Sequence, residues 1–241
     1  MSNPLVQKLE HRFDLSGADR ACLEGLKAHI VSVRARSSII RHGDAPDHAH
    51  IIHSGFACRY KALADGGRLI LSFLIPGDIC DFNAQVLGPM DYSVRALSDC
   101  EIIKIPLKDF NDLTATKPNL DHGFRWISLI DESILREWLV LAKCRSAEKQ
   151  VAHLFCELLA RLGAVGLTEG DRYGLPLTQA DIGDATGLST VHVNRMLQRL
   201  RVEKLVEFKN RQVDILNLKA LKDFAEFDDQ YLHLRQRLAL I

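Results

Sequence analysis

The amino-acid sequence predicts an α+β fold with three parts in order: an antiparallel β domain, a long helix, and a helical domain that ends in a β-hairpin. In the first half, short apolar runs are separated by glycine-containing turns roughly every 10 to 12 residues, a spacing typical of antiparallel barrels. From Pro118 onward, apolar residues recur at alternating steps of four and three, which indicates a long helix. Residues 178–200 then form two short helical patterns joined by a glycine, and an alternating segment follows.

Composition is that of an ordinary globular protein. The chain has 241 residues, 47% hydrophobic and 26% charged, with 31 basic and 31 acidic residues, and this length can form two domains with separate cores. The N-terminus lacks a basic segment followed by an apolar run, and no apolar stretch reaches membrane-spanning length. We therefore expect a cytoplasmic protein without a membrane partner. The six cysteines are scattered and never occur as Cys-x-x-Cys, which argues against a zinc knuckle or a disulfide framework.

The first part, residues 1–116, is predicted to be a jelly roll. Two short helices over residues 4–11 and 18–28 are expected before it. The strands are expected at residues 39–40, 50–52, 56–62, 69–74, 92–97 and 101–105. A jelly roll either fills its interior with its own side chains or encloses a cavity for a small ligand, and the sequence leaves both open.

The second part, residues 117–145, is predicted to be a dimerisation helix and hinge. Its apolar stripe has the spacing of a coiled-coil seam, interrupted only by Asp131. The same stripe could instead pack against the barrel of its own chain. The predicted dimer contacts are Phe124, Ile127, Ile134, Trp138 and Leu141.

The third part, residues 146–241, contains the pattern of a helix-turn-helix, a motif that reads duplex DNA. Thr178 is placed to cap the first helix, with Asp181 near the positive end of that helix. Gly187 suits the left-handed backbone at its end, and Ser189 is placed to cap the second helix. Gly183 allows the two helices to approach closely. The alternative is an ordinary helical hairpin with a solvated polar face.

The second helix of this motif has a buried and an exposed face. Its buried stripe is predicted to be Val193, Met196, Leu197 and Leu200. Amides and a guanidinium on the exposed face match the hydrogen-bond pattern of the major groove. The predicted DNA contacts are Thr178, Ser189, Thr190, Val191, His192, Asn194, Arg195 and Arg199, with Lys209 and Arg211 from the segment that follows.

That following segment, residues 205–215, alternates like a β-hairpin around Asn210, so the motif is predicted to be a winged helix-turn-helix with a further helix after the wing. Between Ser189 and Val213 there are six Lys or Arg residues and two acids, a local charge of +4 in a chain that is neutral overall. A helix-turn-helix usually needs two copies to reach two half-sites about one DNA turn apart, which favours pairing of the long helix.

Jelly roll, long helix and winged helix in this order resemble the Crp/Fnr family of bacterial transcription regulators, most specifically over residues 188–200. The resemblance implies a homodimer without enzymatic activity that binds a palindromic double-stranded DNA operator, has RNA polymerase as a partner, and couples a signal in its N-terminal domain to the dimer helix. By this similarity Arg195 falls on the arginine that reads a guanine. Val191 stands where the family often has a glutamate, and its methyl groups suit a thymine methyl.

The resemblance is weaker for the effector. Members that bind cyclic nucleotides hold the phosphate with an Arg-Ser pair and the ribose with a glutamate, and these positions are Met90, Asp91 and Phe82 here. An apolar residue and an acid leave the cyclic phosphate without its partner charge, so cyclic AMP is not expected to control this chain.

Other signals leave the cofactor unassigned. An iron-sulfur cluster needs four thiolates, whereas Cys22 stands alone near the N-terminus. Haem remains open because four histidines fall in the barrel region, and a thiol redox signal remains open as well. The cofactor is unknown from sequence, and an unidentified small-molecule effector is retained as a partner. The residues in question are His42, His48, His50 and His53 for haem and Cys80, Cys144 and Cys156 for thiol chemistry.

Two hypotheses from other classes accompany this one. The chain could be a jelly-roll ligand- or metal-binding protein with an accessory helical domain, since His48 and His50 have the spacing of two metal ligands. No glutamate follows them within a few residues, and no metal site is predicted. The chain could also be an interaction module that does not bind DNA, which the basic wing disfavours.

Overall fold

The computed structural model describes residues 3–26, 30–81 and 87–234. Helices α1 (Pro4–Glu10) and α2 (Gly17–Gly25) precede the barrel, as predicted, although residues 27 and 28 of the expected second helix lie outside the described residues. The barrel strands are β1 (Ile30–Val33), β2 (Ser38–Ile40), β3 (His48–Ser54), β4 (Ala57–Ala62), β5 (Arg68–Leu74), β6 (Ser93–Ala96) and β7 (Cys100–Pro106).

These strands form two antiparallel sheets, in the orders β1-β7-β3 and β2-β6-β4-β5. Strand β1 was not predicted from the sequence. The turn that joins it to β2 places Arg36, rather than a glycine, in the left-handed region at φ 66°, so no turn residue marked the strand. The predicted antiparallel β domain is confirmed, with one further edge strand.

The space between the sheets is filled by apolar side chains. Ile52, Leu74, Val94 and Ile102 are fully buried there and form one cluster with their neighbours. A separate cavity of about 170 Å³ lies beside the barrel, between Arg59, Tyr92 and the following long helix. The sequence left open whether the barrel is filled or hollow, and the structure shows a filled centre with a cavity at its side.

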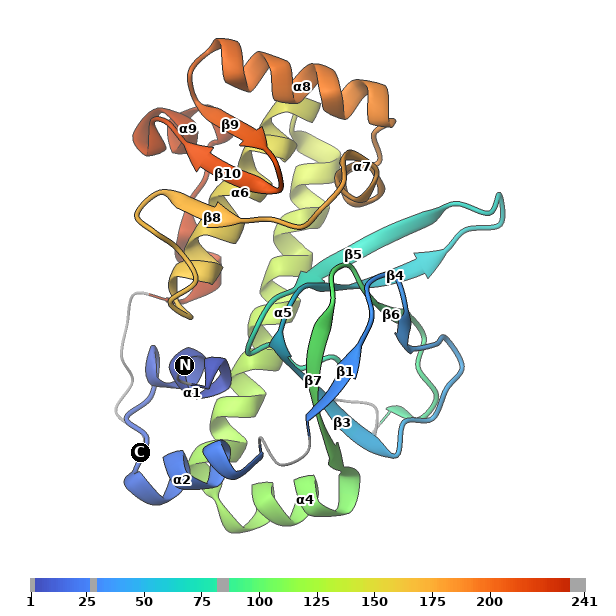
Figure 1. The fold of residues 1–241 in the computed structure, drawn as a ribbon, viewed down its shortest axis with the longest axis vertical. Helices are drawn as coiled ribbons and strands as arrows, with labels where there is room; N and C mark the ends of the chain where they lie inside the picture. Colours follow the sequence, from blue (N-terminus) through green and yellow to red (C-terminus); the bar gives the residue numbers. More distant parts are fainter. Residues whose placement is uncertain (1–2, 27–29, 82–86, 235–241) are drawn as a thin grey trace.

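The helical half begins with α4 (Leu107–Thr116), which was not predicted, and the long helix α5 (Pro118–Cys144), which was. Figure 1 shows α5 running from the foot of the barrel to the C-terminal domain. That domain contains α6 (Ala147–Gly163), β8 (Arg172–Gly174), α7 (Gln179–Thr186), α8 (Thr190–Val202), β9 (Val206–Lys209), β10 (Gln212–Ile215), α9 (Leu218–Ala225) and a 3-10 helix (Asp229–Leu232).

The stripe of α5 that was predicted to pair with a second copy is buried in the chain's own core. Phe124 and Ile127 pack beneath the barrel, with the Phe124 and Phe110 ring centroids 5.1 Å apart. Ile134 and Leu141 are also buried, and Trp138 places its ring 5.9 Å from that of Phe73. Four of the five predicted contacts are therefore buried within the chain and Trp138 is half-buried, so we no longer assign the dimer contact to them. The alternative of packing against the barrel of the same chain is the one observed.

The exception in that stripe, Asp131, has a partner in the barrel. Arg59 donates to the Asp131 carboxylate at 2.8 Å and to the carbonyl oxygen of Cys80 at 3.2 Å. Burial alone would lower the pKa of Arg59, but the nearby Asp131 charge reverses this and raises it. The guanidinium therefore remains charged. Asp131 interrupts the apolar stripe because it lies opposite this buried cation of the barrel.

A buried chain of charges joins the two halves of the molecule. The Arg161 guanidinium on α6 donates to Asp78 of the barrel at 2.8 Å and to Glu157 at 2.9 Å. Lys8 of α1 also pairs with Asp78. Asp78 and Glu157 are 0% exposed. Burial alone would raise the pKa of Asp78, but Lys8 and Arg161 outweigh burial and lower it.

We expect Arg161→Ala to lower the free energy of unfolding by about 3 to 5 kcal/mol, because it leaves two buried carboxylates without their common cation. Arg172→Ala is the matched control, since the pair between Arg172 and Asp214 is largely exposed and contributes at most about 1 kcal/mol. Urea unfolding followed by tryptophan fluorescence measures both. Equal, small losses in the two variants would contradict the assigned role of Arg161.

Candidate nucleic-acid interface

The turn between α7 and α8 has the local geometry that the sequence predicted. The Thr178 hydroxyl accepts from the Asp181 amide at 3.1 Å, and the Asp181 carboxylate accepts from the Thr178 amide at 2.8 Å, which closes a capping box. Gly187 ends α7 in the left-handed conformation at φ 70°, and the Ser189 hydroxyl accepts from the His192 amide. Each of these caps fixes one end of a helix, so the angle between α7 and α8 is set locally.

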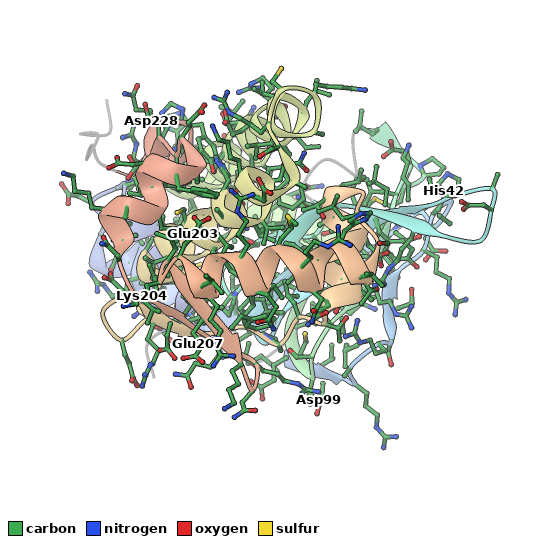
Figure 2. All side chains as sticks on the ribbon, turned by 90° about the horizontal axis from the view of Figure 1, so that it is seen from above. His42, Asp99, Glu203, Lys204, Glu207 and Asp228 are labelled. Atoms are coloured by element: carbon green, nitrogen blue, oxygen red, sulfur yellow. The ribbon has the colours of Figure 1, made fainter. Side chains whose placement is uncertain are left out.

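Helix α8 presents the expected face to solvent. Val193 and Leu200 are fully buried, and Met196 and Leu197 pack beside them. Seen from above in Figure 2, α8 crosses the front of the molecule with its outer side uncovered, and Glu203 and Lys204 mark its C-terminal end. The exposed side chains on it include the predicted contacts Thr190, Val191, His192, Asn194, Arg195 and Arg199, together with Gln198.

Arg199 differs from the other predicted contacts, because carboxylates of its own chain hold it. Its guanidinium donates to Glu203 at 2.9 Å and also pairs with Glu148 on α6. Arg201 lies 3.5 Å from Glu207. The local charge of +4 therefore overstates the positive charge available to DNA at this end of α8.

The wing has the predicted form. Strands β9 and β10 pair in antiparallel register, and Asn210 and Arg211 at the tip have φ of 53° and 60°, as a two-residue hairpin turn requires. The side chains of Lys209 and Arg211 are exposed. Strand β8, which was not predicted, adds a third strand beside β10. The wing thus places two cations on the same domain as the exposed face of α8.

Sequence reasoning missed the contact between α7 and the barrel. Arg36 donates to both carboxylate oxygens of Asp181 at 2.6 and 2.8 Å, and Arg68 bridges Asp181 and Asp184 at 2.7 Å each. Burial would raise the pKa of Asp181, but hydrogen bonds from Arg36 and Thr178 lower it to about 2. The available signal was a pair of acids three residues apart on the first helix of the motif, Asp181 and Asp184.

The cavity beside the barrel offers little to an anionic ligand. Met90 is buried near it, and Asp91 and Glu132 bring carboxylates to its lining. Among the described residues that line it, the cation is Arg59, which is already bonded to Asp131. Phe82, the residue at the expected ribose contact, lies outside the described residues. The absence of cyclic AMP control stays a prediction.

Other candidate cofactor residues have protein partners. The Nδ1 atom of His50 lies 2.8 Å from Asp81, and that of His48 lies 2.5 Å from Asp47. Within the part of the chain that the structure describes, no group of three or more His, Cys, Asp or Glu side chains could hold a metal ion. No helix among these residues combines the length and apolar character needed to span a bilayer.

Among the candidate thiols, two are buried and one is exposed. Burial raises the pKa of Cys156 to about 12 and also raises that of Cys80. These two thiols remain protonated at neutral pH and are poor nucleophiles. Cys144, at the end of α5, is exposed.

Comparisons with known proteins agree with this geometry. A cyclic nucleotide-binding domain family matches residues 30–117, and a Crp-like helix-turn-helix domain family matches residues 149–224. The fumarate and nitrate reduction regulatory protein of Escherichia coli is 24% identical over 193 residues, covering 80% of this chain and 77% of that protein. Regulatory protein HlyX of Actinobacillus pleuropneumoniae is 24% identical over 219 residues, 91% of each chain.

Solved structures share the fold. FixK2 from Bradyrhizobium japonicum superposes with a TM-score of 0.71 at 22% identity, covering 81% of this chain and 96% of FixK2. A CooA mutant from Carboxydothermus hydrogenoformans superposes with a TM-score of 0.66 at 15% identity, covering 84% of this chain and 90% of that one. The predicted order of β domain, long helix and winged helix-turn-helix is confirmed.

We expect Gly183→Ala to destabilise the C-terminal domain by about 1 to 3 kcal/mol, because an added Cβ would lie 2.4 Å from the Leu188 carbonyl oxygen. Gly174→Ala is the control, since a Cβ there meets no atom within 4 Å, and its effect should stay within about 0.5 kcal/mol. Thermal unfolding followed by circular dichroism compares the two variants. Equal melting temperatures would show that α7 and α8 do not need this close approach.

Proposed function

The chain belongs to the Crp/Fnr family of DNA-binding transcription regulators, and from this premise we propose that it acts as a homodimer whose two α8 helices enter successive major grooves of a palindromic operator. The observation that carries the proposal is the uncovered face of α8 beside a basic wing. On this proposal residues 1–116 form the sensor, 117–145 the dimerisation helix and hinge, and 146–241 the DNA-binding domain.

The proposed dimer uses a different face of α5 from the one first predicted. Ser128, Glu132, Leu135, Leu139 and Ala142 keep the alternating steps of four and three, each one residue after a member of the buried stripe. One residue corresponds to about 100° around the helix. Leu139 is 62% exposed in the single chain. Two further exposed apolar side chains, Leu129 and Val140, flank this seam.

Each contact on DNA follows from where its side chain lies. We assign Arg195 to guanine and the Val191 methyl groups to a thymine methyl, while Asn194 and His192 contact either a base or a phosphate. The hydroxyl residues at the helix N-termini and the wing cations contact phosphates. Arg199 is no longer assigned a DNA contact, because Glu148 and Glu203 hold its guanidinium. The phosphate contacts are Thr178, Ser189, Thr190, Lys209 and Arg211.

The remaining partners follow from the same proposal. A regulator bound to operator DNA acts in the cytoplasm and has RNA polymerase as a partner. A small-molecule effector is retained without a chemical identity. The alternative of a metal-binding barrel with an accessory domain is not favoured, because no group of three or more His, Cys, Asp or Glu side chains among the described residues could hold a metal ion.

We expect Arg195→Ala to lose preference for the operator and retain weak, salt-sensitive binding, since a bidentate arginine-guanine pair contributes about 1 to 3 kcal/mol of discrimination per half-site. Lys209→Ala and Arg211→Ala should weaken binding to all sequences alike. The probes are a duplex selected by the wild-type protein from a random library and a scrambled duplex, compared by competition binding. Full operator preference in Arg195→Ala would show that another face of α8 enters the groove.

We expect Leu135→Asp combined with Leu139→Asp to give a folded monomer with little operator affinity, because the change adds four carboxylates to the seam of a dimer and removes its largest apolar side chains. His122→Asp, an exposed change on the same helix away from the seam, is the control and should remain dimeric. Light scattering at micromolar concentration gives the mass of each variant. A monomeric wild-type protein, or a dimeric double variant, would refute the seam.

A further inference from the structure

The DNA-binding domain contacts the sensor barrel directly through α7. Figure 1 places α7 close to β5, and these two elements pack against each other. The contact consists of Arg36 and Arg68 from the barrel and Asp181 and Asp184 from α7, a set of four residues that we call the latch. The latch joins residues more than a hundred positions apart in the sequence.

The carboxylate and the two guanidinium groups of the latch each have fixed neighbours. The Asp181 side chain is 1% exposed and accepts from both arginines. Arg68 is 18% exposed and lies over the Tyr60 ring, 5.8 Å from its centroid. The carbonyl oxygen of Arg36 accepts from Arg95 at 2.6 Å, which fixes the turn that carries it. A bidentate arginine contact with a buried carboxylate selects one orientation of its two partners.

The latch leaves the DNA-reading face open. Helix α8 packs on α6, α7 and β9, all of its own domain. On its outer side Val191 is 69% exposed, and Asn194 and Arg195 are exposed as well. In the view of Figure 2 no part of the drawn barrel covers α8. The latched arrangement is therefore one in which α8 can enter a groove.

We propose that Arg36 and Arg68 hold α7 through Asp181 and Asp184 in the orientation that binds DNA, so that side chains of the sensor barrel set operator affinity with no ligand bound. This inference rests on the proposed DNA-binding function. In a dimer two recognition helices must match two half-sites at once, so freedom of α7 relative to the barrel lowers affinity without any change in α8.

The pair of Arg68 and Asp184 gives the sharpest test. Asp181 also closes the capping box of α7, so its replacement would damage the helix itself. Asp184 has no such second role, and its carboxylate lies 2.7 Å from Arg68 Nε. The variants are Arg68→Asp, Asp184→Arg and the double exchange, which restores opposite charges in reversed positions. Arg34→Asp is the control, because it makes the same charge change on an exposed arginine in the turn that carries Arg36, outside the ion pairs of the latch.

We expect each single latch variant to raise the dissociation constant for the selected operator about 10-fold, within the usual range of coupling between sites. The double exchange should recover part of the affinity lost in Arg68→Asp, because it restores the pair with position 184 but not the bond from Arg68 to Asp181. Arg34→Asp should leave the affinity within about twofold. Hydrogen exchange of the α7 amides without DNA is the second measurement. It should rise in the single variants and fall back in the double exchange.

The outcomes separate the two proposals. Wild-type protein that binds no duplex with sequence preference would overturn the proposed function, and unchanged hydrogen exchange in the single variants would overturn the latch whether or not DNA binds. Normal operator binding with unchanged or tighter affinity in the single variants would overturn the latch alone. A double exchange that binds no tighter than Arg68→Asp alone would also overturn it, because both proteins lack the bond to Asp181 and differ only in the charge at position 184.

Discussion

The arrangement of the whole chain depends on one buried cation, the guanidinium of Arg161. It lies where the barrel, α5 and α6 meet, and it bonds to Asp78, Glu157 and the carbonyl oxygen of Phe73. Glu157 in turn accepts from Trp138 on α5 and from Tyr231 in the C-terminal 3-10 helix. Charges this deeply buried are costly unless every partner is present, so the cluster tolerates one relative placement of these elements. That placement sets how α6 lies against the barrel, while α7 contacts the barrel through separate ion pairs.

Much of this fold was predictable from local sequence signals. The caps at Thr178 and Ser189 and the left-handed Gly187 act within a few residues of the chain, and each took the predicted geometry. The wing follows from a similar local signal at Asn210. Strand β1 was not predicted because the turn after it contains Arg36 at a positive φ in place of a glycine. The hydrogen bond that stabilises this turn comes from Arg95 on β6, which is distant in the sequence. A local signal cannot report a conformation that distant residues stabilise.

The face of α5 shows a second limit. Spacing identifies an apolar stripe on a helix but says nothing of what covers it, and α5 has two such stripes offset by one residue. The stripe with the larger side chains, including Phe124 and Trp138, is covered by the chain's own barrel and α6. The second stripe, with Leu135 and Leu139, remains exposed. Burial of the more apolar stripe removes the larger apolar area from water and so gives the larger free-energy gain. Burial within one chain also does not depend on protein concentration, whereas burial in a dimer does.

Three arginine-aspartate ion pairs each join two separate parts of the chain. Arg59 joins the barrel to α5, Arg68 joins the barrel to α7, and Arg161 joins α6 to the barrel. A ligand entering the cavity beside the barrel would meet Arg59 already bonded to Asp131, so an anion would have to displace a carboxylate of the same chain. Because α5 carries Asp131 and also the proposed seam, such a displacement would act on the dimer helix directly. The ion pair of Arg59 and Asp131 therefore disfavours a weakly bound anion. An anion that binds Arg59 more strongly than Asp131 does would release Asp131 and so act on α5.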